Sequence, residues 1–148
     1  GRLILADALT FAQKFNPLLV IDAATLTGSA YRITANHGAV IMGTDDKNIK
    51  LLKKAGEDTY ERLIELPMWE EFEETLNSNV ADMTNLGSAE GQVVCAGFFL
   101  KNFIDYPWIH IDLAGPTFRN SDSHYLPKGG TGFGVRLLYQ FFKNKFVN

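Results

Sequence analysis

The chain has 148 residues, 46% of them hydrophobic and 21% charged, a composition that suits one folded domain and excludes a disordered or collagen-like protein. Fourteen Lys and Arg against 17 Asp and Glu give a formal charge of −3, and the charges are spread along the chain. The sequence therefore lacks the basic surface that nucleic acid or an anionic membrane would require, and small or peptide-like ligands are the expected partners.

Apolar side chains at helical spacing open the chain. Leu5, Ala8, Leu9 and Ala12 mark the inner face of a helix predicted from Arg2 to Phe15. Neither an initiator Met nor a capping Ser, Thr, Asp or Asn stands ahead of this helix. We therefore expect the sequence to start inside a larger domain, although a lost tag or a processed terminus would also explain the missing Met and capping residue.

Two short apolar runs follow, each typical of a strand that is covered on both faces in a parallel sheet. The first run is Leu18 to Ile21 and leads to Asp22, and the second is Gly38 to Gly43. Between them, the stretch from Gly28 to Asn36 is ambiguous.

Helices flank a long polar segment in the middle of the chain. Asp45 and Asp46 are expected to cap a helix from about Lys47 to Tyr60, and a short acidic helix is predicted from Trp69 to Leu76. The segment from Asn77 to Gly91 is rich in Asn, Ser and Gly and is predicted to be a loop. Loops of this length are often functional.

The last third repeats the alternation of helix and strand. We predict a helix from Gln92 to Ile104, a strand from Trp108 to Leu113, and a final helix from Phe133 to Lys143 that opens at a Gly-rich turn. This order predicts an α/β layer structure with a mainly parallel sheet. Ligands bind such sheets beyond the carboxyl ends of the strands, so the segments to search are Asp22 to Gly28 and Asp112 to Thr117.

The polar residues near these strand ends each have two interpretations. Asp22 and Asp112 are either catalytic carboxylates or acceptors for the backbone N–H groups of the loops that follow. Arg2 is either a surface residue at a frayed terminus or a clamp that holds an anion with its planar fork, and spacing alone favours the surface residue. His110 lies in a predicted strand, where a structural role is expected. The glycines from Gly130 to Gly134 are either a tightly packed turn or a nucleotide-binding loop, and packing is favoured because a third motif glycine is missing.

The lone cysteine, Cys95, is either a small buried apolar residue or a nucleophile, and its apolar helix face favours the first interpretation. A single cysteine forms no internal disulfide, which favours a reducing compartment. The sequence shows no signal peptide and no apolar run of membrane-spanning length. A cytoplasmic location is therefore expected.

Five blocks in order closely resemble the leucyl aminopeptidase (cytosol aminopeptidase) family. They are Gly1–Leu9, Asp22–Gly28, Ser78–Gly87, His110–Gly115 and Lys128–Gly132. The resemblance implies a three-layer α/β/α fold that is incomplete at its N-terminal side. Residues 1–148 would then form the C-terminal portion of a single catalytic domain, without the N-terminal domain and the first part of the catalytic domain.

Members of this family are metalloenzymes that release N-terminal amino acids, preferably leucine-like ones, from peptides and commonly form hexamers. They use two divalent metal ions, zinc or manganese, and bicarbonate. The family signature places an Asp and a Glu that bind both metals immediately before the position of Gly1. The resemblance therefore implies no metal ligands within this chain, and a fragment that is inactive by itself.

Some functional positions do carry over from the family. Arg2 matches the arginine that holds the bicarbonate ion, which is proposed to move the proton of the attacking water. Leu26 matches the residue whose backbone carbonyl faces the substrate. In the family, a pocket holds the side chain of the substrate's N-terminal residue. The positions that form its wall correspond here to Thr25, Gly28, Ala114 and Thr117. Neither Asp22 nor Asp112 matches a metal ligand, which favours a structural role for both.

A second hypothesis assigns the chain the same fold but no catalytic activity. Some members of the family also act as DNA-binding hexamers, so the chain would then be an assembly or binding module. The charge of −3 and the absence of a basic patch argue against nucleic acid as its partner.

Overall fold

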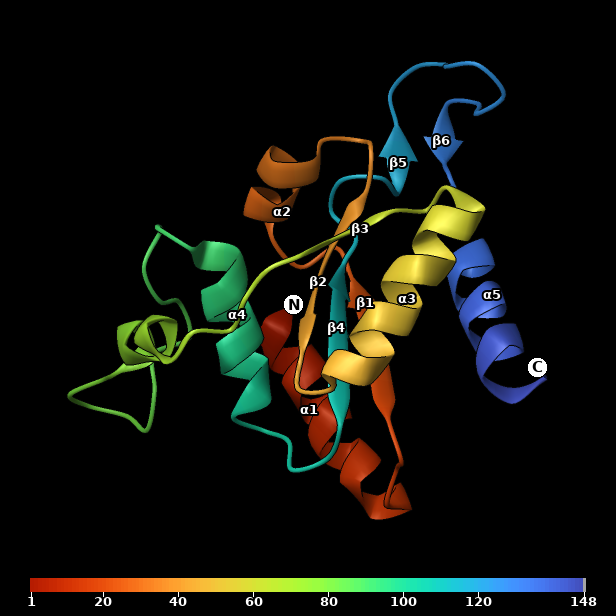
Figure 1. Ribbon diagram of the computed structural model, residues 1–148. Helices are drawn as coiled ribbons and strands as arrows, with labels where there is room; N and C mark the ends of the chain where they lie inside the picture. The colour runs from red at the N-terminus through yellow and green to blue at the C-terminus, as the bar shows by residue number, and fades with distance from the viewer. Residues whose placement is uncertain (148) are drawn as a thin grey trace.

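A computed structural model describes residues 1–147 and shows a mixed α/β fold (Figure 1). The helices are α1 (Arg2–Ala12), α2 (Gly28–Thr34), α3 (Asp46–Thr59), α4 (Gln92–Lys101) and α5 (Val135–Phe146), with 3₁₀ helices η1 (Gln13–Phe15) and η2 (Glu70–Leu76). The strands are β1 (Val20–Ala24), β2 (Ala39–Gly43), β3 (Leu63–Glu65) and β4 (Trp108–Asp112), with the short β5 (Phe118–Arg119) and β6 (Gly129–Gly130).

The main sheet has the strand order β1-β4-β2-β3. β1 runs parallel to β4 and β2 runs parallel to β3, whereas β2 and β4 are antiparallel. Helices α3 and α5 cover one face of the sheet and α1 and α4 the other, which gives three layers (Figure 1). The predicted α/β fold with a mainly parallel sheet is therefore confirmed.

Alternating side chains of the central strand β4 join both layers. Ile109 and Ile111 pack with α3 and α5, while Trp108 belongs to the apolar cluster of α1 and α4. Every residue of β4 is buried, as expected for a strand with a neighbour on each side and a helical layer on each face.

The N-terminal elements differ in detail from the sequence predictions. The first strand begins at Val20 and continues to Ala24, so Asp22 lies inside β1 and does not end it. The ambiguous stretch contains α2, whose N-cap Thr27 accepts a hydrogen bond from the backbone N–H of Ala30 at 3.2 Å. The cap of α3 is Asp45, as predicted, and its side chain accepts from the backbone N–H of Asn48 at 3.0 Å.

Later elements also differ from the sequence predictions. The acidic helix is a 3₁₀ helix, and α4 ends at Lys101 instead of Ile104. The last helix starts two residues late because Gly132 and Gly134 adopt positive φ angles of 69° and 101°, which lie outside the right-handed helical region. The strand β3 was missed because it has only three residues, too few to show a periodic pattern.

A buried carboxylate joins α3's end to the start of α5. Glu61 is 2% exposed and accepts hydrogen bonds from the backbone N–H groups of Gly134 at 3.0 Å and Leu137 at 2.9 Å. The Nε of Arg136 donates to its other oxygen at 3.1 Å, which raises the pKa of that guanidinium. Glu61 therefore serves as the N-terminal cap that Gly134 has no side chain to provide.

We expect Glu61→Gln to lower the free energy of unfolding by about 1–3 kcal/mol, because an amide keeps only one acceptor oxygen and aims an N–H group at a donor. Urea denaturation monitored by circular dichroism measures the change. The matched control is Glu57→Gln, at an exposed position on α3, with an expected change within about 0.5 kcal/mol. Equal effects of the two substitutions would contradict this capping role.

Within residues 1–147, the helices are all too short or too polar to cross a membrane.

Candidate functional site

The carboxyl ends of β1 and β4 lie side by side, because the two strands are parallel and Ala24 is in register with Asp112. The loops that leave these ends carry four of the five predicted substrate-binding residues, and the fifth, Gly28, begins α2 directly after the first loop. Sequence positions almost 90 residues apart are thus brought to one edge of the sheet, as the α/β pattern predicted.

Asp112 ties these two loops together. Its carboxylate accepts from the backbone N–H groups of Leu26 at 3.1 Å, Thr27 at 3.0 Å and Ala114 at 3.2 Å, and from the Thr27 hydroxyl at 2.7 Å. The Asp112 side chain is fully buried. The structural interpretation of Asp112 is therefore confirmed, and its role is to fix the turn that contains Leu26.

Asp22 is also structural, but through side chains and not through the loop backbone. It lies opposite His110 in the sheet and accepts hydrogen bonds from the Nε1 of Trp108 and the Nδ1 of His110, each at 2.6 Å. All three side chains are buried. This network crosses between β1 and β4 on the face covered by α1 and α4, and it agrees with the structural role predicted for His110.

Arg2 lies between α1, the polar loop and α4. Its Nη1 donates to the backbone carbonyl of Asn85 at 2.9 Å, and its guanidinium lies 5.8 Å from the centre of the Phe99 ring. Arg2 is only 9% exposed, and this burial lowers the pKa of its guanidinium. The interpretation of Arg2 as a surface residue at a frayed terminus is therefore wrong.

The five predicted substrate residues differ in exposure. Thr25 and Gly28 are exposed, whereas Leu26, Ala114 and Thr117 are half-buried. Leu26 packs against the cluster that contains Phe99, over which Arg2 lies, so the two residues face the same layer. No hydrogen bond found among residues 1–147 joins Arg2 directly to any of the five.

Sequence reasoning did not identify the partners of Arg2. Asn85 belongs to the block Ser78–Gly87, which the resemblance placed near the active site without a role for any single residue. For Phe99, the sequence indicates only a place in an apolar helix and no contact with Arg2. Cys95 is buried on α4 and lies 3.2 Å from the hydroxyl of Thr75, in line with the small apolar interpretation.

The described residues do not fit a metal centre. Residues 1–147 contain no group of three or more His, Cys, Asp or Glu side chains that could hold a metal ion. The two buried carboxylates near the site, Asp22 and Asp112, already accept hydrogen bonds at both oxygens. No catalytic step through a metal can therefore be built from these side chains.

Comparison with known proteins identifies the family. A family model described as the catalytic domain of the cytosol aminopeptidase family matches residues 1–139. The chain belongs to the cytosol aminopeptidase family. The resemblance of the five sequence blocks is thereby confirmed.

Individual cytosol aminopeptidases agree with this assignment. The chain is 44% identical over 146 residues to a protein of Geobacter sp. (strain M21) named "Probable cytosol aminopeptidase", covering 98% of this chain and 30% of that protein. A protein with the same name from Protochlamydia amoebophila is also 44% identical over 146 residues, with coverage of 97% and 29%. The chain thus spans about 30% of the length of these curated relatives.

A solved structure supports the fold as well. A mutant of tomato leucine aminopeptidase superimposes with a TM-score of 0.87 at 35% sequence identity, covering 95% of this chain and 27% of that chain. The mixed α/β fold described above is therefore that of the aminopeptidase structure.

Proposed function

We propose that this chain is the C-terminal portion of the catalytic domain of a metalloaminopeptidase that releases N-terminal, preferably leucine-like, residues from peptides. The observation that carries the proposal is the match of residues 1–139 to the aminopeptidase catalytic domain. Four of the five substrate residues named by the resemblance lie on the loops that follow β1 and β4, and Asp112 hydrogen-bonds to the backbone of both loops.

Exposed apolar surface beside β1 supports the proposed fragment status. Within the described residues, β1 pairs only with β4, so its other edge is open. Leu3, Ile4 and Phe11 of α1 are each more than half exposed, and Leu18 ahead of β1 is 93% exposed. Such a surface is typical of an interface, and we assign its cover to the upstream part of the same catalytic domain.

The proposal places the two divalent metal ions, zinc or manganese, on ligands in that upstream part, because residues 1–147 offer no suitable cluster. The chain by itself is then inactive. The full-length protein is proposed to be cytoplasmic, to assemble as a homo-hexamer, and to act on peptides without a nucleic acid or membrane partner.

Arg2 is proposed as a catalytic residue that holds bicarbonate. A guanidinium has five N–H donors, and the bond to Asn85 uses one nitrogen, so the fork retains donors for a planar anion. The partly apolar surroundings of Phe99 strengthen the attraction between Arg2 and an anion, because they exclude water. An anion held in this way would accept and return the proton of the attacking water.

The substrate pocket is proposed to consist of Thr25, Leu26, Gly28, Ala114 and Thr117. The side chains at these positions are small apart from Leu26, whose backbone carbonyl is the part assigned to the substrate. An apolar pocket distinguishes side chains by about 1–3 kcal/mol per methylene, so broad specificity is expected.

The proposal is tested by joining this chain to the upstream part of the Geobacter relative and measuring hydrolysis of leucine p-nitroanilide in the presence of Mn²⁺ or Zn²⁺. We expect chelator-sensitive activity in the joined protein and none in the 148-residue chain. In the joined protein, Arg2→Ala should lower kcat about 10²-fold. The matched control Arg32→Ala, at an exposed position of α2, should leave kcat unchanged.

Two outcomes would overturn the proposal. Chelator-sensitive hydrolysis by the chain alone would show that it holds its own metals. A joined protein that folds, forms hexamers and binds both metals but hydrolyses no peptide would instead support the non-catalytic assembly module.

A further inference from the structure

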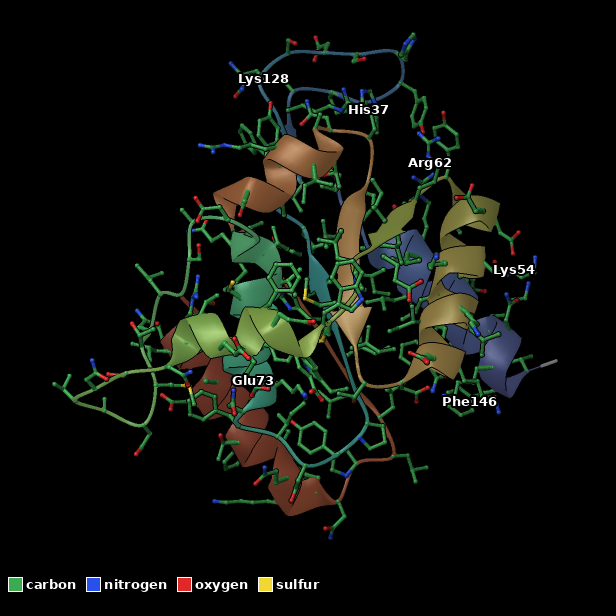
Figure 2. All side chains as sticks on the ribbon, turned by 60° about the vertical axis from the view of Figure 1, so that its left-hand side comes forward. His37, Lys54, Arg62, Glu73, Lys128 and Phe146 are labelled. Carbon is green, nitrogen blue, oxygen red and sulfur yellow. The ribbon has the colours of Figure 1, made fainter. Side chains whose placement is uncertain are left out.

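A cavity of about 390 Å³ has a lining that includes neither Arg2 nor any of the five predicted substrate-binding residues. Its walls come from the segment between α2 and β2, the turn between α3 and β3, the loop between β5 and β6, and the start of α5. Figure 2 shows His37 and Arg62 in this part of the molecule, near the loop that carries Lys128 and away from Glu73. The volume is within the range of small-molecule binding pockets.

The cavity concentrates positive charge. Three of the five arginines of the chain line it, namely Arg62, Arg119 and Arg136. The only acidic lining residue is Glu61, whose oxygens are already bonded to α5 and Arg136. The lining therefore has a formal charge of +2 with neutral histidines, in a chain whose total charge is −3.

Two of these arginines each have a buried nitrogen that makes no hydrogen bond to the described residues. The Nε atoms of Arg62 and Arg119 are buried and have no hydrogen-bond partner among residues 1–147. Arg62 is held in place from one side, because its guanidinium lies 4.4 Å from the centre of the Tyr60 ring. A buried, unpaired donor on a charged group is costly, so the protein leaves part of the charge of these two arginines uncompensated.

The remaining walls suit the organic part of a ligand. Tyr60, Tyr125 and Phe133 present aromatic surface, and Ser123 and Thr131 add hydroxyl groups. The cavity is several times larger than a lone oxyanion needs. An anion that carries a planar or apolar group would fill it better than an inorganic ion.

We propose that this cavity binds a small organic phosphate, with the phosphate group between Arg62 and Arg119 and the organic part against the aromatic walls. A phosphate monoester carries close to two negative charges at neutral pH, which matches the charge of the lining. Guanidinium forks bind phosphate oxygens in a bidentate manner, and the side chains of Arg62 and Arg119 both line the cavity.

Isothermal titration of the complete chain with phenyl phosphate, inorganic phosphate and succinate tests the proposal at constant ionic strength. We expect one phenyl phosphate per chain, bound about fivefold more tightly than inorganic phosphate because of the aromatic walls. Arg62→Gln and Arg119→Gln should each weaken phenyl phosphate about tenfold. The control Lys50→Gln removes the same charge from an exposed position on α3 and should change the affinity less than twofold.

A second measurement needs no variant and therefore does not depend on how the variants fold. Phenyl phosphate should protect Arg62 and Arg119, but not exposed Arg32, from modification by phenylglyoxal, as read by peptide mass spectrometry. The proposal is overturned by the absence of saturable phosphate binding, by tighter binding of succinate, by equal affinity for phenyl and inorganic phosphate, or by protection of Arg32 to the same extent.

Discussion

Asp112→Ala is expected to lower the free energy of unfolding by about 3–5 kcal/mol. The substitution would leave the backbone N–H groups of Leu26, Thr27 and Ala114 without their acceptor at a largely buried position. A domain of this size has a total stability of about 5–15 kcal/mol, so the variant should be partly unfolded in mild urea. Urea denaturation followed by circular dichroism and by tryptophan fluorescence measures the loss.

Asp112→Asn provides the graded comparison. The amide keeps one acceptor oxygen, so we expect about half of the loss in the free energy of unfolding that Asp112→Ala causes. The control Asp105→Ala, at an exposed position, should change the free energy of unfolding by less than about 0.5 kcal/mol. If Asp112→Asn abolished peptide hydrolysis in the joined protein while the stability stayed unchanged, Asp112 would be a catalytic residue, and its structural interpretation would be incomplete.

Patterns among neighbouring residues were sufficient to predict most helices and strands of the fold. The helices α1 and α3 could be predicted because amphipathic periodicity and the cap at Asp45 are encoded by neighbouring residues. The buried strand β4 could be predicted from its continuous apolar run. In contrast, β3 gains its strand conformation from pairing with β2, a long-range contact that three residues do not reveal.

The location of the candidate site could be predicted from the α/β pattern and the family motif, but its contacts could not. The strand ends could be named as a search area, but the hydrogen bonds of Asp112 depend on a loop 85 residues earlier in the chain. The arginine cavity gave no signal at all, because Arg62 and Arg119 lie far apart in a sequence with net negative charge. Only the folded chain brings such groups together.

Asp22→Leu is the second substitution with a large expected effect, a loss of about 3–5 kcal/mol in the free energy of unfolding. The leucine would leave Trp108 Nε1–H and His110 Nδ1–H unpaired at positions that exclude water. A carboxylate only accepts, so we assign an imidazole hydrogen to the Nδ1 of His110. Urea denaturation again measures the change.

A double-mutant cycle separates the hydrogen bond from simple loss of packing. His110→Leu by itself removes one donor and leaves Asp22 bonded to Trp108, so a smaller loss than that of Asp22→Leu is expected. In the double variant Asp22→Leu/His110→Leu no imidazole donor is left unpaired, so the total loss should be at least 1 kcal/mol less than the sum of the single losses. Strictly additive losses would mean that the Asp22–His110 contact contributes no coupling energy, and that β1 and β4 are joined by their backbone ladder and apolar packing alone.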